Sequence, residues 1–83
     1  MKEHNIKLLY VFADDVFSGR KSFEIRKNDR DYALGDRIKF LVIDSEGNVI
    51  SHPITACTYE ITYILDGWGL KDGYVALGLG PLI

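Results

Sequence analysis

The chain has 83 residues, of which 47% are hydrophobic, and its formal net charge is −2. This length allows one domain with a single modest core, and the composition is globular rather than disordered or collagen-like. The slightly negative charge argues against a strongly basic protein that binds polyanions in bulk.

The cysteine content and the first residues bear on the compartment. Cys57 is the only cysteine, so no internal disulfide can form, which fits a reducing compartment. Residues 1–5 lack the apolar run of a signal peptide, and no apolar run reaches the roughly 20 residues that span a bilayer. We therefore expect a soluble, cytoplasmic domain with no membrane partner. Cys57 itself is predicted to be a small buried hydrophobe rather than a nucleophile.

The first third of the chain predicts a strand followed by a helix. In residues 4–9 the apolar Ile6 and Leu8 alternate with polar residues, as in a strand. Apolar residues then recur at helical spacing over residues 10–18. Gly19 can supply the left-handed residue that ends this helix.

A second strand is predicted over residues 21–26, where apolar and polar residues alternate. Side chains two apart on a strand leave the same face. We expect Phe23 and Ile25 to form the buried face, and Glu24 and Arg26, together with Ser22, to share the solvent face.

The rest of the chain reads as turns and further strands. Glycine, asparagine and aspartate mark turns at residues 28–31, 34–36, 45–48 and 66–73. Between them, strands are predicted at residues 37–44, 49–52, 54–65 and 74–79. Because strands outnumber helices, the expected fold is mixed α/β and β-rich: a small barrel or open rolled sheet with one helix packed on it.

Five basic residues lie within one eleven-residue stretch: Arg20, Lys21, Arg26, Lys27 and Arg30. A solvated strand edge explains such a cluster more often than a nucleic-acid site does, and a Glu24–Arg26 pair on a solvent face would add about 0 to 1 kcal/mol. The residues alone thus favour the structural interpretation.

Enzyme signatures and metal sites have little support in the sequence. There is no P-loop, no dinucleotide glycine fingerprint and no zincin pair. His4 and His52 are far apart and have no cysteines near them, so both are expected to be ordinary surface or edge histidines. We predict neither a metal nor a cofactor.

One segment carries a family resemblance. Residues 19–26, Gly-Arg-Lys-Ser-Phe-Glu-Ile-Arg, fit the Gly-x-Lys-x-x-Glu-x-Arg motif of the activating-signal-cointegrator homology (ASCH) superfamily at all four fixed positions. With Asn-Asp-Arg-Asp at residues 28–31 and the segments 63–65 and 69–75, the chain resembles a short bacterial and phage branch of unknown function within that superfamily.

The resemblance implies a PUA-like β-barrel with the motif along a cleft beside the first helix, where members are proposed to bind RNA. Lys21 would then contact phosphate, Arg26 would make a forked contact to phosphate or base, and Glu24 would orient one of them. The remaining expected site residues are a positive rim and two aromatic rings for base stacking: Arg20, Lys27, Arg30, Tyr32 and Trp68. Both rings are also plausible structural residues, Tyr32 more so than Trp68.

Two alternatives stay open from the sequence. Some small members of the superfamily are amidohydrolases acting on an acylated cytidine, with a threonine at the position of Glu24. Glu24 cannot replace that hydroxyl as nucleophile, although Lys21 and Glu24 could serve as a base and acid pair. The other alternative is a protein-interaction or phage accessory module that uses an exposed edge strand. The sequence leaves the oligomeric state open.

Overall fold

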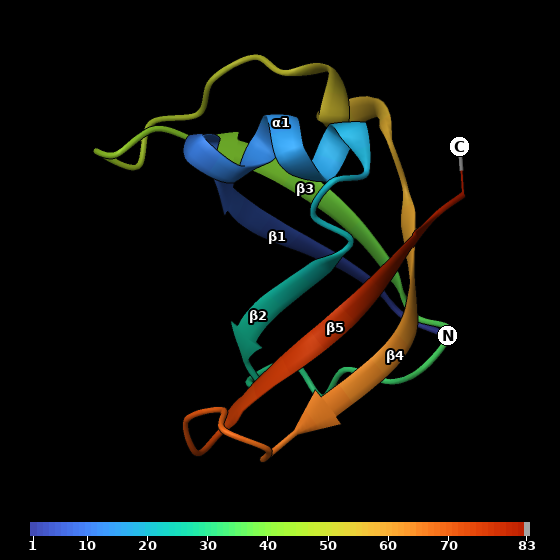
Figure 1. Cartoon of the computed structure of the whole chain (residues 1–83). Helices are drawn as coiled ribbons and strands as arrows, with labels where there is room; N and C mark the ends of the chain where they lie inside the picture. The colour runs from blue at the N-terminus through green and yellow to red at the C-terminus, as the bar shows by residue number, and fades with distance from the viewer. Residues whose placement is uncertain (83) are drawn as a thin grey trace.

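The computed structural model describes residues 1–82 and contains five strands, one α-helix and one 3₁₀ helix (Figure 1). In chain order these are β1 (Glu3–Leu9), α1 (Tyr10–Ser18), β2 (Phe23–Lys27), β3 (Arg37–Ile43), η1 (Pro53–Ala56), β4 (Tyr59–Asp66) and β5 (Tyr74–Pro81). The β-rich fold with one helix agrees with the sequence prediction. No helix in the described part of the chain is long and apolar enough to cross a membrane.

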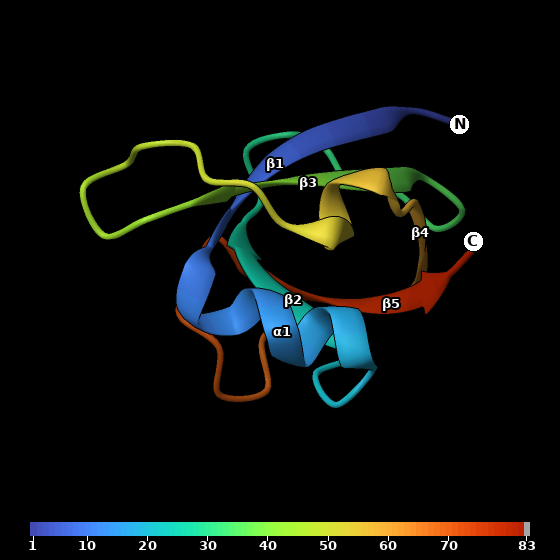
Figure 2. The same ribbon diagram turned by 90° about the horizontal axis from the view of Figure 1, so that it is seen from above.

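All five strands belong to one curved sheet with the order β1-β3-β4-β5-β2. The β1–β3 pair is parallel, and the other three pairs are antiparallel. Viewed from above, β1 and β3 lie on one side, β2 and β5 on the other, and β4 connects them (Figure 2). Within residues 1–82 no ladder joins β1 to β2, so the sheet is not closed into a barrel and these two strands are its edges.

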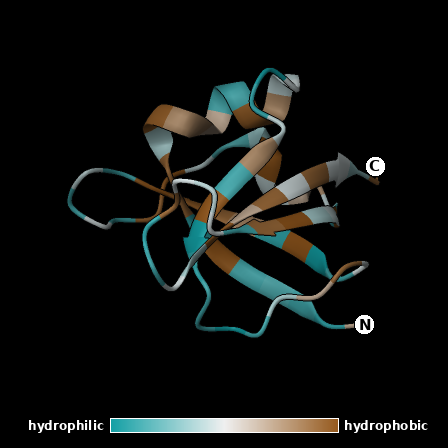
Figure 3. Ribbon diagram, turned by 60° about the horizontal axis from the view of Figure 1, so that its bottom comes forward, coloured by the Kyte–Doolittle hydropathy of each residue, from teal (hydrophilic) through white to brown (hydrophobic). Residues whose placement is uncertain are grey.

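The core lies inside the curve of the sheet. Hydrophobic and hydrophilic residues alternate along the strands (Figure 3), and on β1, β3 and β5 the hydrophobic ones face inward. The inward residues of β1, β3 and β5 are nearly all aliphatic or aromatic: Ile6, Leu8, Ile38, Phe40, Val42, Val75, Leu77 and Leu79. Burial of these side chains is the main favourable term in folding.

The helix has the predicted bounds, residues 10–18, and it packs against β1 and β3 through Ala13 and Val16. Gly19 ends it in the left-handed conformation, with φ 85°, and its N–H donates to the carbonyl of Val16. The N–H of Lys21 then donates to the carbonyl of Asp15 at 3.0 Å. This tight exit turns the chain directly into β2.

Two predicted strands are wrong in part. Residues 49–52 form no strand, and only an isolated bridge joins Val49 to Ile43. The predicted strand 54–65 begins instead with η1, because Pro53 fixes φ at the first helical position. The ring Nδ1 of His52 accepts a hydrogen bond from the N–H of Ile54, which caps the turn.

Two predicted side-chain environments also differ. His4 is buried rather than exposed, because its Nε2 lies 2.9 Å from the carboxylate of Asp36 inside the fold. Cys57 is half-buried at the end of η1, where it packs against the core without lying fully inside it. Its position after η1, rather than within an alternating strand, accounts for the partial exposure.

Candidate functional site

The β2 strand presents its charged face to the interior, opposite to the sequence prediction. Glu24 pairs with the buried Leu77 of β5, and Arg26 pairs with the buried Val75. Residues paired across a ladder point to the same face of a sheet. Phe23 and Ile25 therefore point outward, where they are 46% and 50% exposed. Alternation predicted the period correctly but assigned the faces the wrong way round.

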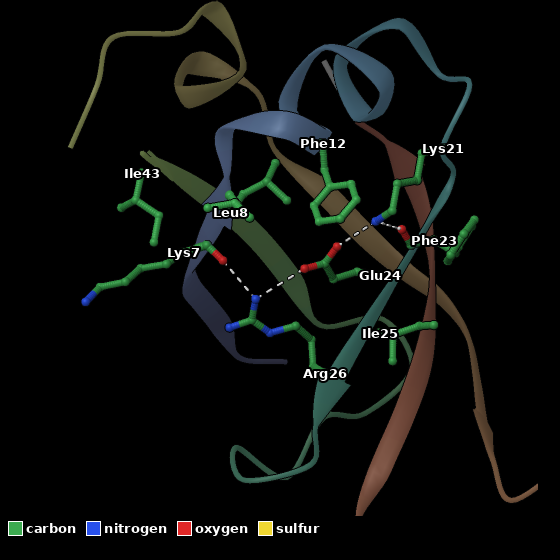
Figure 4. Close-up of a pocket in the computed structure, with 10 residues that line it drawn as sticks. Lys7, Leu8, Phe12, Lys21, Phe23, Glu24, Ile25, Arg26 and Ile43 are labelled. Carbon is green, nitrogen blue, oxygen red and sulfur yellow. Dashed lines mark hydrogen bonds and ion pairs between the residues drawn. The ribbon is translucent and has the colours of Figure 1, made fainter. Parts of the chain in front are cut away.

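Glu24 is the centre of a charged triad (Figure 4). Its carboxylate Oε1 accepts from Lys21 Nζ at 2.9 Å, and its Oε2 accepts from Arg26 Nη1 at 3.2 Å. Glu24 is only 5% exposed, whereas the two cationic side chains are partly exposed. A buried carboxylate needs such partners, since an unpaired buried charge is very costly. One anion between two cations leaves the triad with a net charge of +1.

The ammonium group of Lys21 is fixed by neighbours on several sides. Besides Glu24, Nζ donates to the carbonyl of Phe23 at 2.9 Å. It also lies 5.1 Å from the ring centroid of Phe12 and 4.8 Å from that of Phe23, within the range of cation–π attraction. Lys21 precedes β2 and reaches the inward Glu24 because the turn at Gly19 brings it to the strand entrance.

Arg26 joins the two edges of the sheet. Its Nη1 donates to the carbonyl of Lys7 on β1 at 2.8 Å as well as to Glu24 on its own strand (Figure 4). Both of these bonds come from Nη1, and the guanidinium also lies close to the buried hydroxyl of Tyr32. The site therefore occupies the opening between β1 and β2.

A cleft of about 640 Å³ opens at this place. Its polar lining comes from the triad and from the backbone carbonyl of Lys7, whose side chain points away from the triad (Figure 4). The other lining residues are apolar: Leu8, Leu9, Phe12, Phe23, Ile25 and Ile43. The sequence prediction found the triad but missed the β1, α1 and β3 residues. Helical spacing had marked Phe12 as apolar, yet no local signal placed it or Ile43 beside the motif.

The other predicted site residues do not line the cleft. Arg20, Lys27 and Arg30 are exposed outside it, so the basic cluster of the sequence divides in space. Trp68 is 89% exposed in the loop between β4 and β5, in a left-handed conformation with φ 52°. Of the predicted residues, the structure brings together Lys21, Glu24 and Arg26.

Tyr32 lies in the core, which agrees with its structural interpretation. Its ring centroid is 4.7 Å from that of His4. The hydroxyl is buried and has no hydrogen-bond partner among residues 1–82. Burial raises the pKa of this phenol, and the nearby guanidinium of Arg26 opposes that rise. The hydroxyl therefore lies close to the guanidinium of Arg26.

Asp36 lies directly before β3 and accepts several hydrogen bonds. Its carboxylate accepts hydrogen bonds from the N–H of Lys2 at 3.0 Å, from His4 Nε2 at 2.9 Å and from the N–H of Ala33 at 3.1 Å. These bonds, that from Lys2 first, lower the pKa of Asp36 to about 2. Asp36 thus keeps its negative charge at neutral pH and holds the N-terminal strand in place.

The chemistry available in the cleft is that of an anion contact beside an apolar surface. Lys21 and Arg26 retain donors for an anion, and the ring of Phe12 offers a stacking face. Elsewhere in residues 1–82, no group of three or more His, Cys, Asp or Glu side chains is placed to hold a metal ion.

Comparison with known families gives one match. The model of a family described as a domain of unknown function, DUF3850, matches residues 3–79. This range includes the triad, β1 to β4 and most of β5, so the chain belongs to that family. No curated protein matches the chain.

Proposed function

We propose that this member of the family binds a nucleotide unit, free or within an unpaired RNA strand, in the cleft between β1 and β2. The observation that carries the proposal is the orientation of β2. It turns Glu24 and Arg26 inward at positions where neighbouring strands place aliphatic side chains. Burying charges is no efficient way to stabilise a fold, and departures from the core pattern concentrate at functional sites.

The charge of the triad fits one phosphate group of a nucleic-acid strand. A phosphodiester carries a single negative charge, and the triad carries a net +1. Lys21 has one ammonium proton beyond its two protein acceptors, and Arg26 has more guanidinium donors than protein contacts. Both cations are partly exposed, so a ligand can reach them without breaking their contacts to Glu24.

The apolar walls fit the base and sugar of the same ligand. A cleft of about 640 Å³ is within the roughly 300–1,000 Å³ of small-molecule sites. Phe12 lies over Lys21 on the cleft side and supplies a stacking face. It replaces Trp68 and Tyr32 in that role, because Trp68 lies outside the cleft and Tyr32 is buried. Arg20, Lys27 and Arg30 contribute long-range attraction only.

The proposal includes a relation to the ASCH superfamily and its PUA-like fold. Two observations support it. Lys21 lies beside Phe12 of α1 (Figure 4), and the sheet curls toward a barrel-like shape (Figures 1 and 2). A cytoplasmic location would give the domain access to RNA.

The decisive experiment is a titration of a short fluorescein-labelled single-stranded RNA at low salt. The proteins are the wild type, Lys21→Ala and a matched control, Lys71→Ala, whose lysine lies outside the cleft. Affinity should fall with salt with a logarithmic slope near −0.7 per phosphate contact. Lys21→Ala should weaken binding and flatten the slope, and Lys71→Ala should not. Equal binding by wild type and Lys21→Ala, or no binding at all, would refute the proposal.

One contact favours a second function. Lys21 Nζ and Glu24 Oε1 are 2.9 Å apart in the cleft, as a base and acid pair in a hydrolase would be. Purified protein would then release acetate from an acetylated cytidine, and Lys21→Ala would abolish the release. We rank this function second, because both oxygens of Glu24 are engaged by cations. Acetate release by the wild type would reverse the order.

A further inference from the structure

The free edge of β2 carries unused backbone groups. In the β2–β5 ladder, the N–H of Leu79 donates to the carbonyl of Ser22, and the N–H of Asn28 donates to the carbonyl of Gly73. Bonded and non-bonded pairs alternate along an antiparallel ladder. The backbone groups of Glu24 and Arg26 therefore face β5, and those of Phe23, Ile25 and Lys27 face away from it.

Ile25 differs from Phe23 and Lys27, whose backbone groups also face away from β5. The carbonyl of Phe23 accepts from Lys21 Nζ at 2.9 Å, and the carbonyl of Lys27 accepts from the N–H of Asp29 at 2.9 Å. Neither the N–H nor the C=O of Ile25 has a partner within residues 1–82. Ile25 also lines the cleft, between Glu24 and Arg26 in the chain. It is the one residue of β2 that offers the cleft a free donor and a free acceptor side by side.

This pattern decides between two kinds of occupant. A peptide added as a strand needs several free backbone pairs in register along the edge. The carbonyls on either side of Ile25 are already engaged, so the edge cannot continue as a ladder. A planar group with one adjacent donor and acceptor needs a single residue. The Watson–Crick edge of an unpaired nucleobase is such a group.

We infer that the backbone N–H and C=O of Ile25 hold the Watson–Crick edge of an unpaired nucleobase whose phosphate lies at Lys21 and Arg26. The inference rests on the proposed function and adds the part of the base that is recognised. A base within a duplex has this edge occupied, so the site selects single strands or free nucleotides. Because Watson–Crick edges generally offer a neighbouring donor and acceptor, the site discriminates unpaired from paired bases more strongly than one base from another.

The first test uses ligands on the wild-type protein. Uridine monophosphate is compared with its 3-methyl derivative, and guanosine monophosphate with its 1-methyl derivative, by calorimetry or NMR titration. Each methyl group replaces the ring N–H donor of the Watson–Crick edge, N3–H of uracil or N1–H of guanine, and blocks the approach to the adjacent carbonyl without changing the charge. Loss of the hydrogen bonds at this edge should weaken binding by about tenfold or more. Equal affinity for methylated and unmethylated nucleotides would overturn the inference and leave the proposed function standing.

The second test removes the protein donor. Ile25→Pro lacks the N–H but keeps the ladder to β5, because proline is tolerated on an edge strand where its nitrogen faces outward. It should bind unmethylated nucleotides as weakly as the wild type binds methylated ones, while Ile25→Val should bind normally. A folded Ile25→Pro with wild-type affinity would overturn the inference. If no nucleotide binds the wild type, the proposed function itself is refuted. If methylated and unmethylated nucleotides bind equally well, only the inferred recognition of the Watson–Crick edge is refuted.

Discussion

Arg26 on β2 donates a hydrogen bond from Nη1 to the backbone carbonyl of Lys7 on β1 over 2.8 Å, and so connects the two unpaired edges of the sheet. The same nitrogen contacts Glu24 at 3.2 Å. Unpaired strand edges tend to pair with other chains unless they are covered or charged. Arg26 therefore has a structural role between the unpaired edges of β1 and β2, in addition to its proposed role in binding phosphate.

The structural role predicts a loss of stability on Arg26→Ala. Removing the guanidinium leaves the buried Glu24 with Lys21 alone and the carbonyl of Lys7 without its donor. We expect the free energy of unfolding to fall by about 1 to 3 kcal/mol, measured by urea denaturation. Arg26→Lys should recover part of this loss, because an ammonium group can reach only some of the acceptors. Arg30→Ala, at an exposed position, serves as the control. If Arg30→Ala and Arg26→Ala lower the free energy of unfolding equally, the structural role of Arg26 between β1 and β2 is contradicted.

The lowered pKa of Asp36 predicts how the free energy of unfolding decreases at acid pH. Its pKa is lowered from 3.8 to about 2 in the folded protein. A carboxyl group with a lowered folded-state pKa stabilises the protein above its unfolded pKa, and that contribution disappears as the pH falls through the folded value. About 2 kcal/mol should therefore be lost between roughly pH 4 and pH 2.

The measurement for Asp36 compares unfolding curves of the wild type and Asp36→Asn across this pH window. The variant should be less stable at neutral pH, because it loses the ionised acceptor for Lys2, His4 and Ala33. Its stability should change less between pH 4 and pH 2. Parallel pH profiles for the two proteins would show that another group controls the acid limb.

The sequence predicted the helix and the presence of β2 because both depend on local pattern. Residues 10–18 carry apolar residues at helical spacing and end at a glycine that tolerates a left-handed conformation. Apolar and polar residues alternate from Ser22 to Arg26, which predicts a strand, and the observed strand is Phe23–Lys27. Alternation alone does not say which face is buried, and here the triad's ion pairs allow the charged face inside. The preference for apolar residues in the core therefore gave the wrong face.

The cleft could not be predicted as a whole because tertiary pairing assembles it. The motif residues Lys21, Glu24 and Arg26 are close in sequence, and the family resemblance drew attention to them. Lys7 and Ile43 come from β1 and β3, whose parallel pairing no local signal encodes. The strand predicted from residue 54 failed for a local reason, because Pro53 starts a helical turn there.

The buried hydroxyl of Tyr32 leads to a prediction about stability. Its hydroxyl lies near the guanidinium of Arg26 but makes no hydrogen bond of standard geometry within the described residues. A buried hydroxyl in that state costs free energy relative to one with a well-formed hydrogen bond. Tyr32→Phe should therefore keep or raise the free energy of unfolding, by up to about 1 kcal/mol. The ring contact with His4 is retained in the variant. A drop of more than about 1 kcal/mol in a thermal or urea experiment would show that the hydroxyl has a stabilising partner in solution.

Gly80 lies where β5 passes the bulge in β4. The register of the two strands shifts between Ile61 and Tyr63, which leaves Thr62 as the extra residue. A Cβ atom added at Gly80 would lie 2.7 Å from Thr62 Cγ2, and one added at Gly78 would lie 2.9 Å from Thr62 Oγ1. Thr62 therefore occupies the space that side chains at both glycines would need.

Gly80→Ala should be destabilising although alanine normally improves a strand position held by glycine. The clash with Thr62 Cγ2 requires either the Thr62 side chain or one of the strands to shift, and such overpacking costs about 1 to 3 kcal/mol. Thr62→Ser removes the Cγ2 methyl and, at an exposed position, should change stability little by itself. The double variant should recover most of the loss, because the two positions are in contact and their effects do not add. Urea denaturation of the four proteins gives the coupling energy, and additive effects would show that the loss at Gly80 does not come from contact with the Thr62 methyl.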